Sequence, residues 1–405
     1  MKLYRIIIIL VCAVFINTIK AQQLSDSAQI SLLTCGAGNQ LYSTFGHSAI
    51  RICDKKNNID LVFNYGTFNF STPNFYLKFS RGTLIYMLSV NNFRDFLQNY
   101  KYENRSVYEQ KLNITQDEKE KLFSLLIENY EPQNRNYRYD FFKDNCSTRI
   151  RDAFQKAIGE KLKFHNQNTT GNKTFRELIC PYLEKMQWSK FGIDILLGMP
   201  TDMRATNADY MFLPNELLKN VDTATINGIK FASPVEVLYQ AHKISISKPL
   251  SPILAFFAFM AIIILLSLLE FRYLLKNRKI NLKIFDRTFF AILAILSLII
   301  LLMWIFSLHY PVRNNLNILW LNPLYLYVFF KLEKSNFYII LICIICNLTV
   351  LCGQCFLPQH FNTAFFAIII AATMRLIMLT AKMHIKIKQN SLCRLLNHFK
   401  IILLN

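Results

Sequence analysis

Cys146 is the residue whose position best suits nucleophilic chemistry. Asp144 and Asn145 are favourable residues for the start of a helix, and apolar residues then recur at helical spacing up to Gly159. Cys146 therefore falls in the first turn, where free backbone N–H groups and the positive end of the helix dipole favour a thiolate. The same N–H groups could hold the oxyanion that forms when a thiolate attacks a carbonyl. The alternative is structural, because a buried cysteine is more often a small apolar core residue.

A nucleophilic cysteine needs a base, and histidine is the candidate. The histidines considered for this role are His47, His165, His242 and His309. His47 follows Gly46 in a strand-like stretch, and a glycine there would permit the close approach of another backbone or a ligand. A histidine in a strand is more often a satisfied core residue, and the separation of His47 from Cys146 is uninformative by itself.

The elements expected around these residues are strands and one further helix. Enrichment in β-branched and aromatic residues predicts strands at residues 30–33, 43–53 and 60–65. Thr115 and Glu118 have the spacing of a capping box, which predicts a helix from there to about Asn129. Strand alternation places Asn64 and Tyr65 on opposite faces of the third strand.

The other cysteines leave several readings open. Cys35 and Cys53 could form a disulfide in an oxidising compartment, as could either of them with Cys180, and spacing selects no pair. Two Cys-x-x-Cys pairs, at residues 343–346 and 352–355, have redox or metal spacing. The first pair lies inside an apolar run and no third or fourth ligand is nearby, so no metal site is expected.

Composition divides the chain into four segments. Residues 1–21 have the basic start, apolar centre and small final residue of a signal peptide. Residues 22–248 read as a globular domain, residues 249–382 hold the apolar runs, and residues 383–405 form a basic tail. The net charge is +20, but residues 249–405 alone carry 15 basic and 3 acidic residues. No basic and aromatic motif accompanies the charge, so no nucleic-acid partner is expected.

The apolar runs predict a bundle of about five transmembrane helices. They occupy residues 250–269, 288–308, 318–330, 337–352 and 361–381, of which the third and fourth are short for a bilayer. Lys and Arg concentrate in the loop after the first run and in the tail, which the positive-inside rule places in the cytoplasm. The globular domain and the signal peptide then both indicate an extracytoplasmic N-terminal half.

An ordered set of short stretches resembles a known family. The stretches are residues 32–38 (LLTCGAG), 41–51 (LYSTFGHSAIR), 63–68 (FNYGTF), 139–149 (YDFFKDNCSTR), 211–214 (MFLP) and 319–324 (LWLNPL). They follow one another in order along nearly the whole chain, and the ordered set resembles the Lnb family, the lipoprotein N-acyltransferases of Bacteroides-group bacteria. The resemblance implies an α+β domain of permuted papain-like (NlpC/P60-type) fold in residues 22–248, followed by the transmembrane bundle. In that fold the histidine precedes the cysteine and the cysteine opens a helix.

The resemblance also implies the chemistry and its partners. Cys146 is expected to take an acyl chain from a phospholipid as a thioester, and to pass it to the α-amine of a diacylated lipoprotein. His47 would be the base and Asn64 the group that orients it, while Tyr42, Tyr65 and Arg313 would contact substrate. No cofactor is expected, and the site would lie on the periplasmic side of the bacterial inner membrane, among membrane lipids.

Two other functions remain open at this point. A membrane-anchored cysteine peptidase or amidase acting on cell-wall peptides would use the same Cys146 and His47 pair, although one anchor would suffice for it. A non-enzymatic membrane assembly protein would use both residues structurally, and its Cys146 would resist alkylation at neutral pH.

Overall fold

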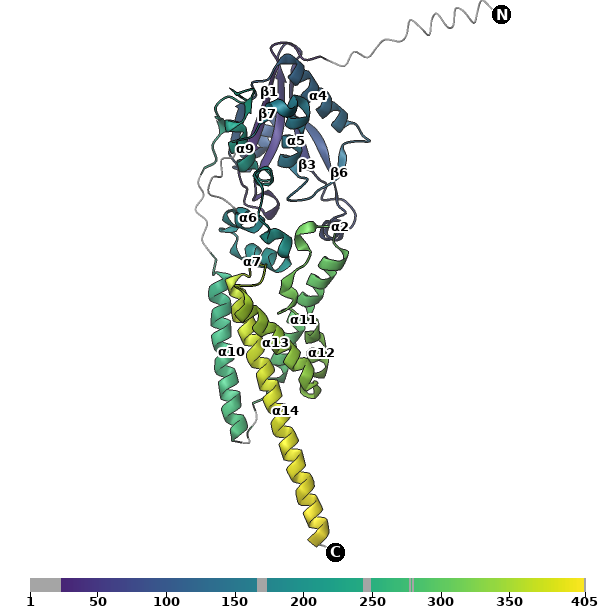
Figure 1. Ribbon diagram of the computed structural model, residues 1–405, viewed down its shortest axis with the longest axis vertical. Helices are drawn as coiled ribbons and strands as arrows, with labels where there is room; N and C mark the ends of the chain where they lie inside the picture. Colours follow the sequence, from purple (N-terminus) through teal and green to yellow (C-terminus); the bar gives the residue numbers. More distant parts are fainter. Residues whose placement is uncertain (1–22, 166–172, 243–248, 277, 279, 404–405) are drawn as a thin grey trace, which may run out of the picture.

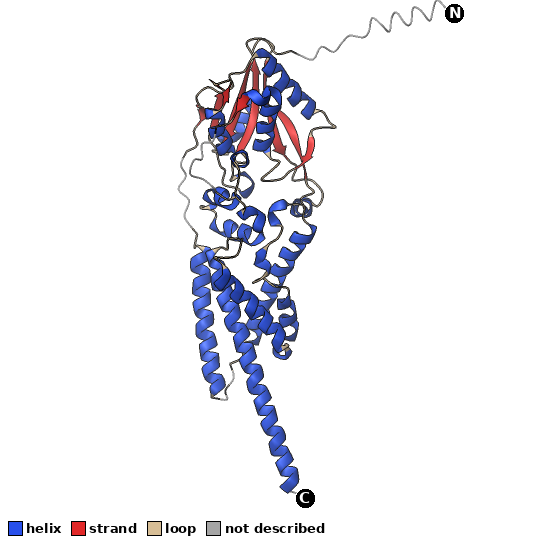
Figure 2. Ribbon diagram, in the orientation of Figure 1, coloured by secondary structure: helices blue, strands red, loops and turns tan. Residues whose placement is uncertain are grey.

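The computed structural model describes residues 23–165, 173–242, 249–276, 278 and 280–403, without the side chains of residues 333 and 386–403. An N-terminal mixed α/β domain, a layer of short helices and a long helical region follow one another along the molecule (Figures 1 and 2). The C-terminus lies at the end opposite the β-sheet. The expected signal peptide, residues 1–21, lies outside the described residues.

A seven-stranded antiparallel sheet forms the frame of the N-terminal domain. Its strands, in the order in which they neighbour one another, are β10 (Glu236–Tyr239), β5 (Val107–Lys111), β1 (Gln29–Cys35), β2 (His47–Asp54), β3 (Ile59–Thr67), β4 (Ile85–Asn92) and β6 (Asn136–Arg138). The central strands carry apolar side chains on both faces, so both faces are covered by helices.

Helices α4 (Gln116–Tyr130) and α5 (Cys146–Ile158) cover one face, where Ile50 and Phe63 pack with Ile150. Helix α3 (Phe93–Tyr102) covers the other face, where Ala49 and Val62 pack with its Phe96. Helix α9 (Pro214–Thr223) packs against β1. The remaining elements of this domain are α2 (Phe75–Arg81), α8 (Asn207–Tyr210) and a small sheet of β7 (Leu162–Lys163), β8 (Thr225–Ile226) and β9 (Ile229–Lys230).

The sequence predicts these elements well, with one shift. The expected strands at residues 30–33 and 60–65 lie within β1 and β3, and Thr115 forms both hydrogen bonds of the capping box that opens α4. The strand expected at residues 43–53 begins only at His47. Residues 41–43 form a 3-10 turn instead, and Gly46 turns the chain with a φ of +85°.

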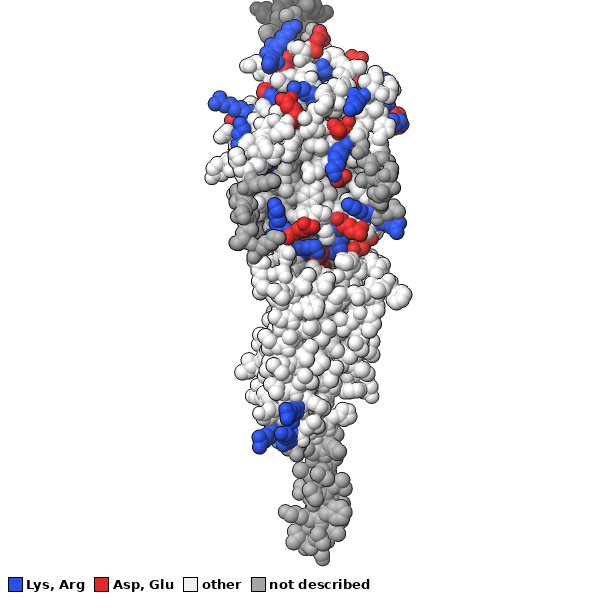
Figure 3. Space-filling model, turned by 90° about the vertical axis from the view of Figure 1, so that its left-hand side faces the viewer, with Lys and Arg blue, Asp and Glu red and all other residues white. Residues whose placement is uncertain are grey.

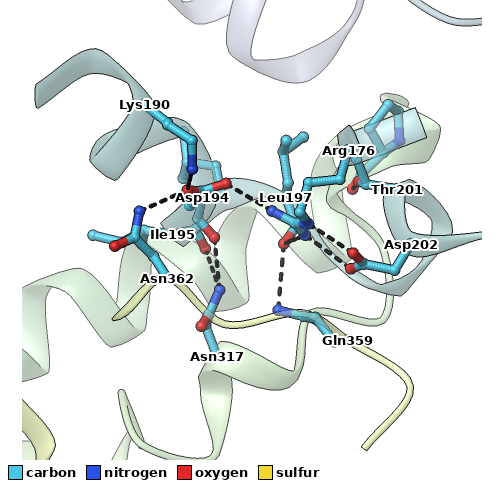
Figure 4. A network of polar contacts seen from close by, with 12 residues as sticks. Arg176, Lys190, Asp194, Ile195, Leu197, Thr201, Asp202, Asn317, Gln359 and Asn362 are labelled. Atoms are coloured by element: carbon cyan, nitrogen blue, oxygen red, sulfur yellow. Dashed lines mark hydrogen bonds and ion pairs between the residues drawn. The ribbon is translucent and has the colours of Figure 1, made fainter. Parts of the chain in front are cut away.

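Helices α6 (Phe175–Leu183) and α7 (Gln187–Leu196) form a junction between the N-terminal domain and the long helices (Figure 1). Buried Arg176 forms ion pairs with Asp194 and Asp202, at 2.9 and 2.8 Å (Figure 4). The second oxygen of Asp194 accepts a hydrogen bond from Asn362 at 2.7 Å, and Asn317 donates to the Asp194 carbonyl at 2.9 Å. Since Asn317 and Asn362 belong to the helical region, this polar network joins the two halves.

Among the described residues, three helices are long and apolar enough to cross a membrane: α10 (Pro252–Leu275), α11 (Lys283–Phe306) and the first part of α14 (Thr363–Leu403). They correspond to the first, second and fifth expected runs. The third run becomes α12 (Leu324–Lys331), which at about 1.5 Å per residue is too short to cross alone. The fourth becomes α13 (Phe337–Gly353), a shorter apolar helix. The backbone of the expected basic tail continues α14.

The surface of the helical region is divided into zones by charge. Figure 3 shows charges of both signs over the N-terminal domain and in a belt at its base, then a wide uncharged band, then a patch of Lys and Arg alone. Inside the band, Arg375 of α14 forms ion pairs with Glu270 of α10 and Asp286 of α11, at 2.8 and 2.6 Å. Lys382 reaches Glu270 at 2.6 Å. The buried charges balance, as burial in an apolar bundle requires.

The suggested disulfide between Cys35 and Cys53 is wrong. Cys35 pairs with His47 at one end of the β1–β2 hairpin, whereas Cys53 pairs with Gln29 at the other end. Six strand residues separate the two ends by about 20 Å, while bridged cysteines have Cα atoms within about 7 Å. Cys180 belongs to α6 in the junction, and the eight cysteines whose side chains are described are all free.

Candidate active site

Cys146 is the first residue of α5, where the sequence predicts it. The side-chain oxygen of Asn145 accepts hydrogen bonds from the N–H groups of Ser147 and Thr148, at 2.9 and 3.0 Å. The Thr148 hydroxyl accepts from the Asn145 N–H at 2.8 Å, which completes a reciprocal cap. Asn145 therefore occupies two amides that were expected to serve an oxyanion. Among the described residues nothing accepts the N–H of Cys146 itself, which leaves that donor for a ligand.

Strands β2 and β3 separate where Cys146 lies. They pair from Asp54 and Ile59 up to Ile50 and Phe63, and no further. Beyond that point the start of α5 contacts both strands, and His47 and the Ser48 N–H of β2 act on the Cys146 thiol. The Ser48 hydroxyl is 3.0 Å from that of Ser147, which ties β2 to α5 beside the pair. The split between the strands is what lets a helix on one face meet a histidine on the other.

The surroundings of Cys146 favour its thiolate. Burial is the largest influence and would by itself raise the pKa of this thiol. The charge of His47, a hydrogen bond from its ring, and hydrogen bonds from the Ser48 N–H and the Ser147 hydroxyl together outweigh burial. The pKa of Cys146 therefore lies below its usual value, as nucleophilic cysteines require.

Asn64 lies within hydrogen-bonding distance of His47. Its side-chain oxygen is 3.4 Å from Nε2 of His47. Its amide group donates to the Val62 carbonyl at 3.4 Å and to the side-chain oxygen of Asn91 at 3.0 Å. A carbonyl can only accept, so the Asn64 NH₂ must face Val62 and its oxygen must face His47. The ring of His47 also stacks on Tyr100 of α3, with centroids 6.5 Å apart.

A buried tyrosine hydroxyl without a partner lies beside Cys146. Tyr137 of β6 is 8% exposed, and its hydroxyl makes no hydrogen bond to any described residue. A methyl group built on Gly66 would lie 3.8 Å from Cβ of Cys146 and 3.9 Å from the Tyr137 hydroxyl. Gly66, with a φ of +88°, thus leaves open a small space that both groups border. The guanidinium of Arg149 lies 3.5 Å from the centre of the Tyr137 ring and holds it in place.

Comparison with known proteins adds the family. A family model described as the Lnb N-terminal periplasmic domain matches residues 16–179, which include Cys146, His47, Asn64 and Tyr137. A second, described as the Lnb transmembrane domain, matches residues 243–387. The chain belongs to the Lnb family. It is therefore a lipoprotein-processing membrane protein with a periplasmic part. Neither a curated protein nor a solved structure matched the chain.

The residues expected to contact substrate in this Lnb protein lie in three different environments. Tyr42 is exposed, and its ring meets those of Phe68 and Phe70 at 6.5 and 6.0 Å. Tyr65 is buried in the core, facing away from Asn64 as alternation predicts, and its hydroxyl accepts a hydrogen bond from Asn129. Arg313 is exposed in the loop that packs against the end of α7, and the structure does not bring it into contact with Cys146.

The other cysteine and histidine candidates of this Lnb protein have partners or surroundings away from Cys146. Burial raises the pKa of the Cys35 thiol to about 12, so this cysteine stays protonated and apolar. His165 bonds the Thr225 hydroxyl at 2.8 Å, and His309 donates to the Phe79 carbonyl at 2.6 Å. The side chains of the described residues form no cluster of three or more metal ligands.

Sequence reasoning missed Tyr137, Ser48 and Asn91. Tyr137 lies on a strand of three residues, too short for a periodic pattern, and the contribution of Ser48 is a backbone group that any residue supplies. The glycine at position 66 was the available signal, because glycine within a strand marks close approach or open space. The arrangement brings together a thiol with a lowered pKa, a histidine and an amide within reach of that histidine, which are the residue types that nucleophilic catalysis by cysteine uses.

Proposed function

We propose that this Lnb protein is a lipoprotein N-acyltransferase. It would move an acyl chain from a phospholipid to Cys146, and then to the α-amine of a diacylglyceryl-cysteine. The observation that carries the proposal is the placement of His47 beside Cys146 at the start of α5, where the charge of His47 helps to lower the pKa of the buried thiol. The lipid character of both substrates agrees with a domain joined tightly to apolar helices.

In the first step the Cys146 thiolate attacks the carbonyl carbon of a phospholipid ester. The tetrahedral oxyanion would be held by the Cys146 N–H and by the Tyr137 hydroxyl, which makes no hydrogen bond to any described residue. The C–O bond then breaks, His47 gives its proton to the departing lysophospholipid alkoxide, and a thioester remains on Cys146.

In the second step the α-amine of the lipoprotein cysteine attacks the thioester. His47, now neutral and oriented by Asn64, takes the proton from the amine. The C–S bond breaks, the amide product leaves, and the Cys146 thiolate forms again beside protonated His47. A thioester suits this reaction because amines attack it readily, and it divides one slow transfer into two faster ones.

The proposal includes a fold type and a topology. An antiparallel sheet with the cysteine at the start of a helix, after the histidine in sequence, agrees with the permuted papain-like arrangement. Five crossings of the inner membrane, with α12 and α13 as the short third and fourth, would leave the N-terminal domain in the periplasm. The patch of Lys and Arg at the far end of the uncharged band would then lie in the cytoplasm (Figure 3).

Mass spectrometry of lipoprotein N-termini tests this function. Cells that lack only this activity are complemented with the wild-type chain, Cys146→Ala or His47→Ala, and each protein is quantified in the membrane fraction. We expect the wild type to restore the third acyl chain and both variants to fail while accumulating normally. The matched control is Cys35→Ala, which removes a second buried cysteine opposite His47 in the hairpin and is expected to restore acylation.

The possible failures are informative in different ways. Full restoration by Cys146→Ala or His47→Ala would show that the catalytic pair is wrong. No restoration by the wild type would overturn lipoprotein acylation itself, and cleavage of cell-wall peptides would become the leading function.

A further inference from the structure

A continuous group of aromatic side chains lies at the surface between the N-terminal domain and α11. We name it the aromatic shelf; its members are Tyr42, Phe68, Phe70, Phe75, Tyr76 and Phe79. Neighbouring rings are in contact, with centroids 4.9 Å apart for Phe68 and Phe70 and 5.0 Å for Phe70 and Phe75. Tyr42, Phe70 and Tyr76 are 62, 59 and 79% exposed. A contiguous exposed apolar surface of this kind marks an interaction site.

At one end the aromatic shelf leads to the nucleophile. The ring of Phe68 contacts that of Tyr86 at 5.3 Å, and Tyr86 stacks on Tyr139 at 4.5 Å. Tyr139 borders the space beside Gly66, 3.6 Å from a methyl group built there, and Cys146 borders the same space. A series of rings therefore leads from the exposed surface to the space beside Gly66, which Cys146 borders from another side.

At the other end the aromatic shelf meets the end of a membrane-spanning helix. The Leu308 N–H donates to the Arg81 carbonyl at 2.9 Å, just after α11 ends at Phe306. His309 donates to the Phe79 carbonyl at 2.6 Å, and the two rings lie 5.8 Å apart. These bonds hold α2 at the level where α11 leaves the apolar band, and aromatic residues are enriched at that level in membrane proteins.

The charge of the segment that contains most of the aromatic shelf indicates which kind of lipid head group would bind there. Residues 61–94 contain no Asp or Glu, although they include three basic residues. Two of these, Lys78 and Arg81, lie in the last turn of α2, and neither forms an ion pair with a described residue. Unpaired cations beside exposed aromatic rings match a molecule with an anionic head and an apolar tail.

We propose that the aromatic shelf receives the acyl chains of a glycerophospholipid from the leaflet around the end of α11, with the phosphate held by Lys78 and Arg81. The lipid follows the series of rings until its ester carbonyl reaches Cys146. Assigning this lipid as the acyl donor rests on the proposed acyltransferase function, but binding to the shelf does not require acyl transfer.

Photo-crosslinking tests the surface without any turnover. The full chain carrying Cys146→Ala is placed in lipid nanodiscs that contain a small fraction of phosphatidylglycerol with a diazirine in one acyl chain. After illumination, cross-linked peptides are mapped by mass spectrometry, and cross-links on α10 serve as the internal reference. We expect peptides from residues 68–86 to be labelled strongly, in addition to the spans.

Paired variants on the same background decide whether the labelling is specific. Phe70→Ser with Tyr76→Ser is expected to lower the ratio of shelf to α10 cross-links about tenfold, because it removes two aromatic contacts with the chain. Lys78→Gln with Arg81→Gln is expected to lower the same ratio of cross-links severalfold. Tyr102→Ser, which removes a 92% exposed aromatic residue at the end of α3, is the matched control and is expected to leave it unchanged.

Labelling confined to the spans, or an unchanged ratio in the Phe70 and Tyr76 variant, would overturn the shelf as a lipid site. The lipoprotein assay separates this result from failure of the proposed function. A labelled shelf in a protein that does not acylate lipoproteins would overturn the proposed acyltransferase function and support the shelf as a lipid site. Active acylation without shelf labelling would remove the lipid site alone.

Discussion

Replacing Tyr137 with phenylalanine should change stability and activity in opposite directions. The hydroxyl of Tyr137 is buried and makes no hydrogen bond within the described structure, so folding takes it out of water without compensation. An unsatisfied buried polar group costs about 1–3 kcal/mol, and removing it relieves part of that cost. A gain of about 1 kcal/mol corresponds to a rise in melting temperature of about 2 °C for a protein of this size.

The same substitution removes one of the two donors assigned to the oxyanion. Loss of a single such donor lowers acyl-transfer rates on the order of 100- to 1000-fold. The rate of acyl-enzyme formation, followed by intact mass spectrometry of the full chain with a phospholipid donor, measures this loss. Alkylation of Cys146 by iodoacetamide should change little, because that reaction forms no oxyanion.

Tyr65→Phe provides the contrast in stability. The Tyr65 hydroxyl accepts a hydrogen bond from Asn129 at 3.1 Å, so its removal should destabilise the protein by about 1 kcal/mol. The reasoning is refuted if Tyr137→Phe acylates at the wild-type rate, since the hydroxyl would then have no part in the chemistry. A fall in melting temperature with Tyr137→Phe would show that the hydroxyl has a partner in the folded protein.

Three further outcomes follow from the described contacts. His47→Ala should raise the pKa of Cys146 above the usual thiol value, because burial then dominates. Alkylation of Cys146 at pH 7 should slow about tenfold for each unit by which this pKa rises. An unchanged pH dependence of alkylation would contradict the pairing of Cys146 with His47. Asn64→Ala should lower kcat about tenfold or more and leave the melting temperature nearly unchanged. A lower kcat together with a clearly lower melting temperature would indicate a structural role for Asn64. Asp194→Ala should destabilise the protein by about 3 kcal/mol, because it leaves Arg176 buried without one partner. A melting curve like that of the wild type would refute the inference that this ion pair stabilises the junction.

The position of Cys146 was predictable from local signals, whereas its pairing with His47 was predicted only through the family resemblance. Favourable cap residues and a clear helical period place Cys146 at the start of α5, and strand alternation separates Asn64 from Tyr65. What the sequence does not contain is the split between β2 and β3, which depends on how long two strands stay paired. Without that split, His47 on one face and a helix on the other would not be expected to meet.

The missed features share a cause. Each missed feature depends on contacts between side chains that no helical or strand periodicity relates. This holds for Tyr137, for the aromatic shelf and for the Arg176 network. The Cys35 and Cys53 disulfide was wrong for a related reason. Composition and compartment allowed this disulfide. The register of the β1–β2 hairpin, however, places the two residues at opposite ends, and only strand pairing defines that register.

The ion cluster around Arg375 has a consequence for how the protein is made. Glu270 and Asp286 lie on the first two spans, so the ribosome delivers both carboxylates before it delivers their cation. Until the last span arrives, two acidic groups stand in an apolar environment without a counter-charge, which opposes their stable burial. A nascent chain that stops short of α14 is therefore expected to leave both carboxylates without the cation that neutralises them in the complete protein.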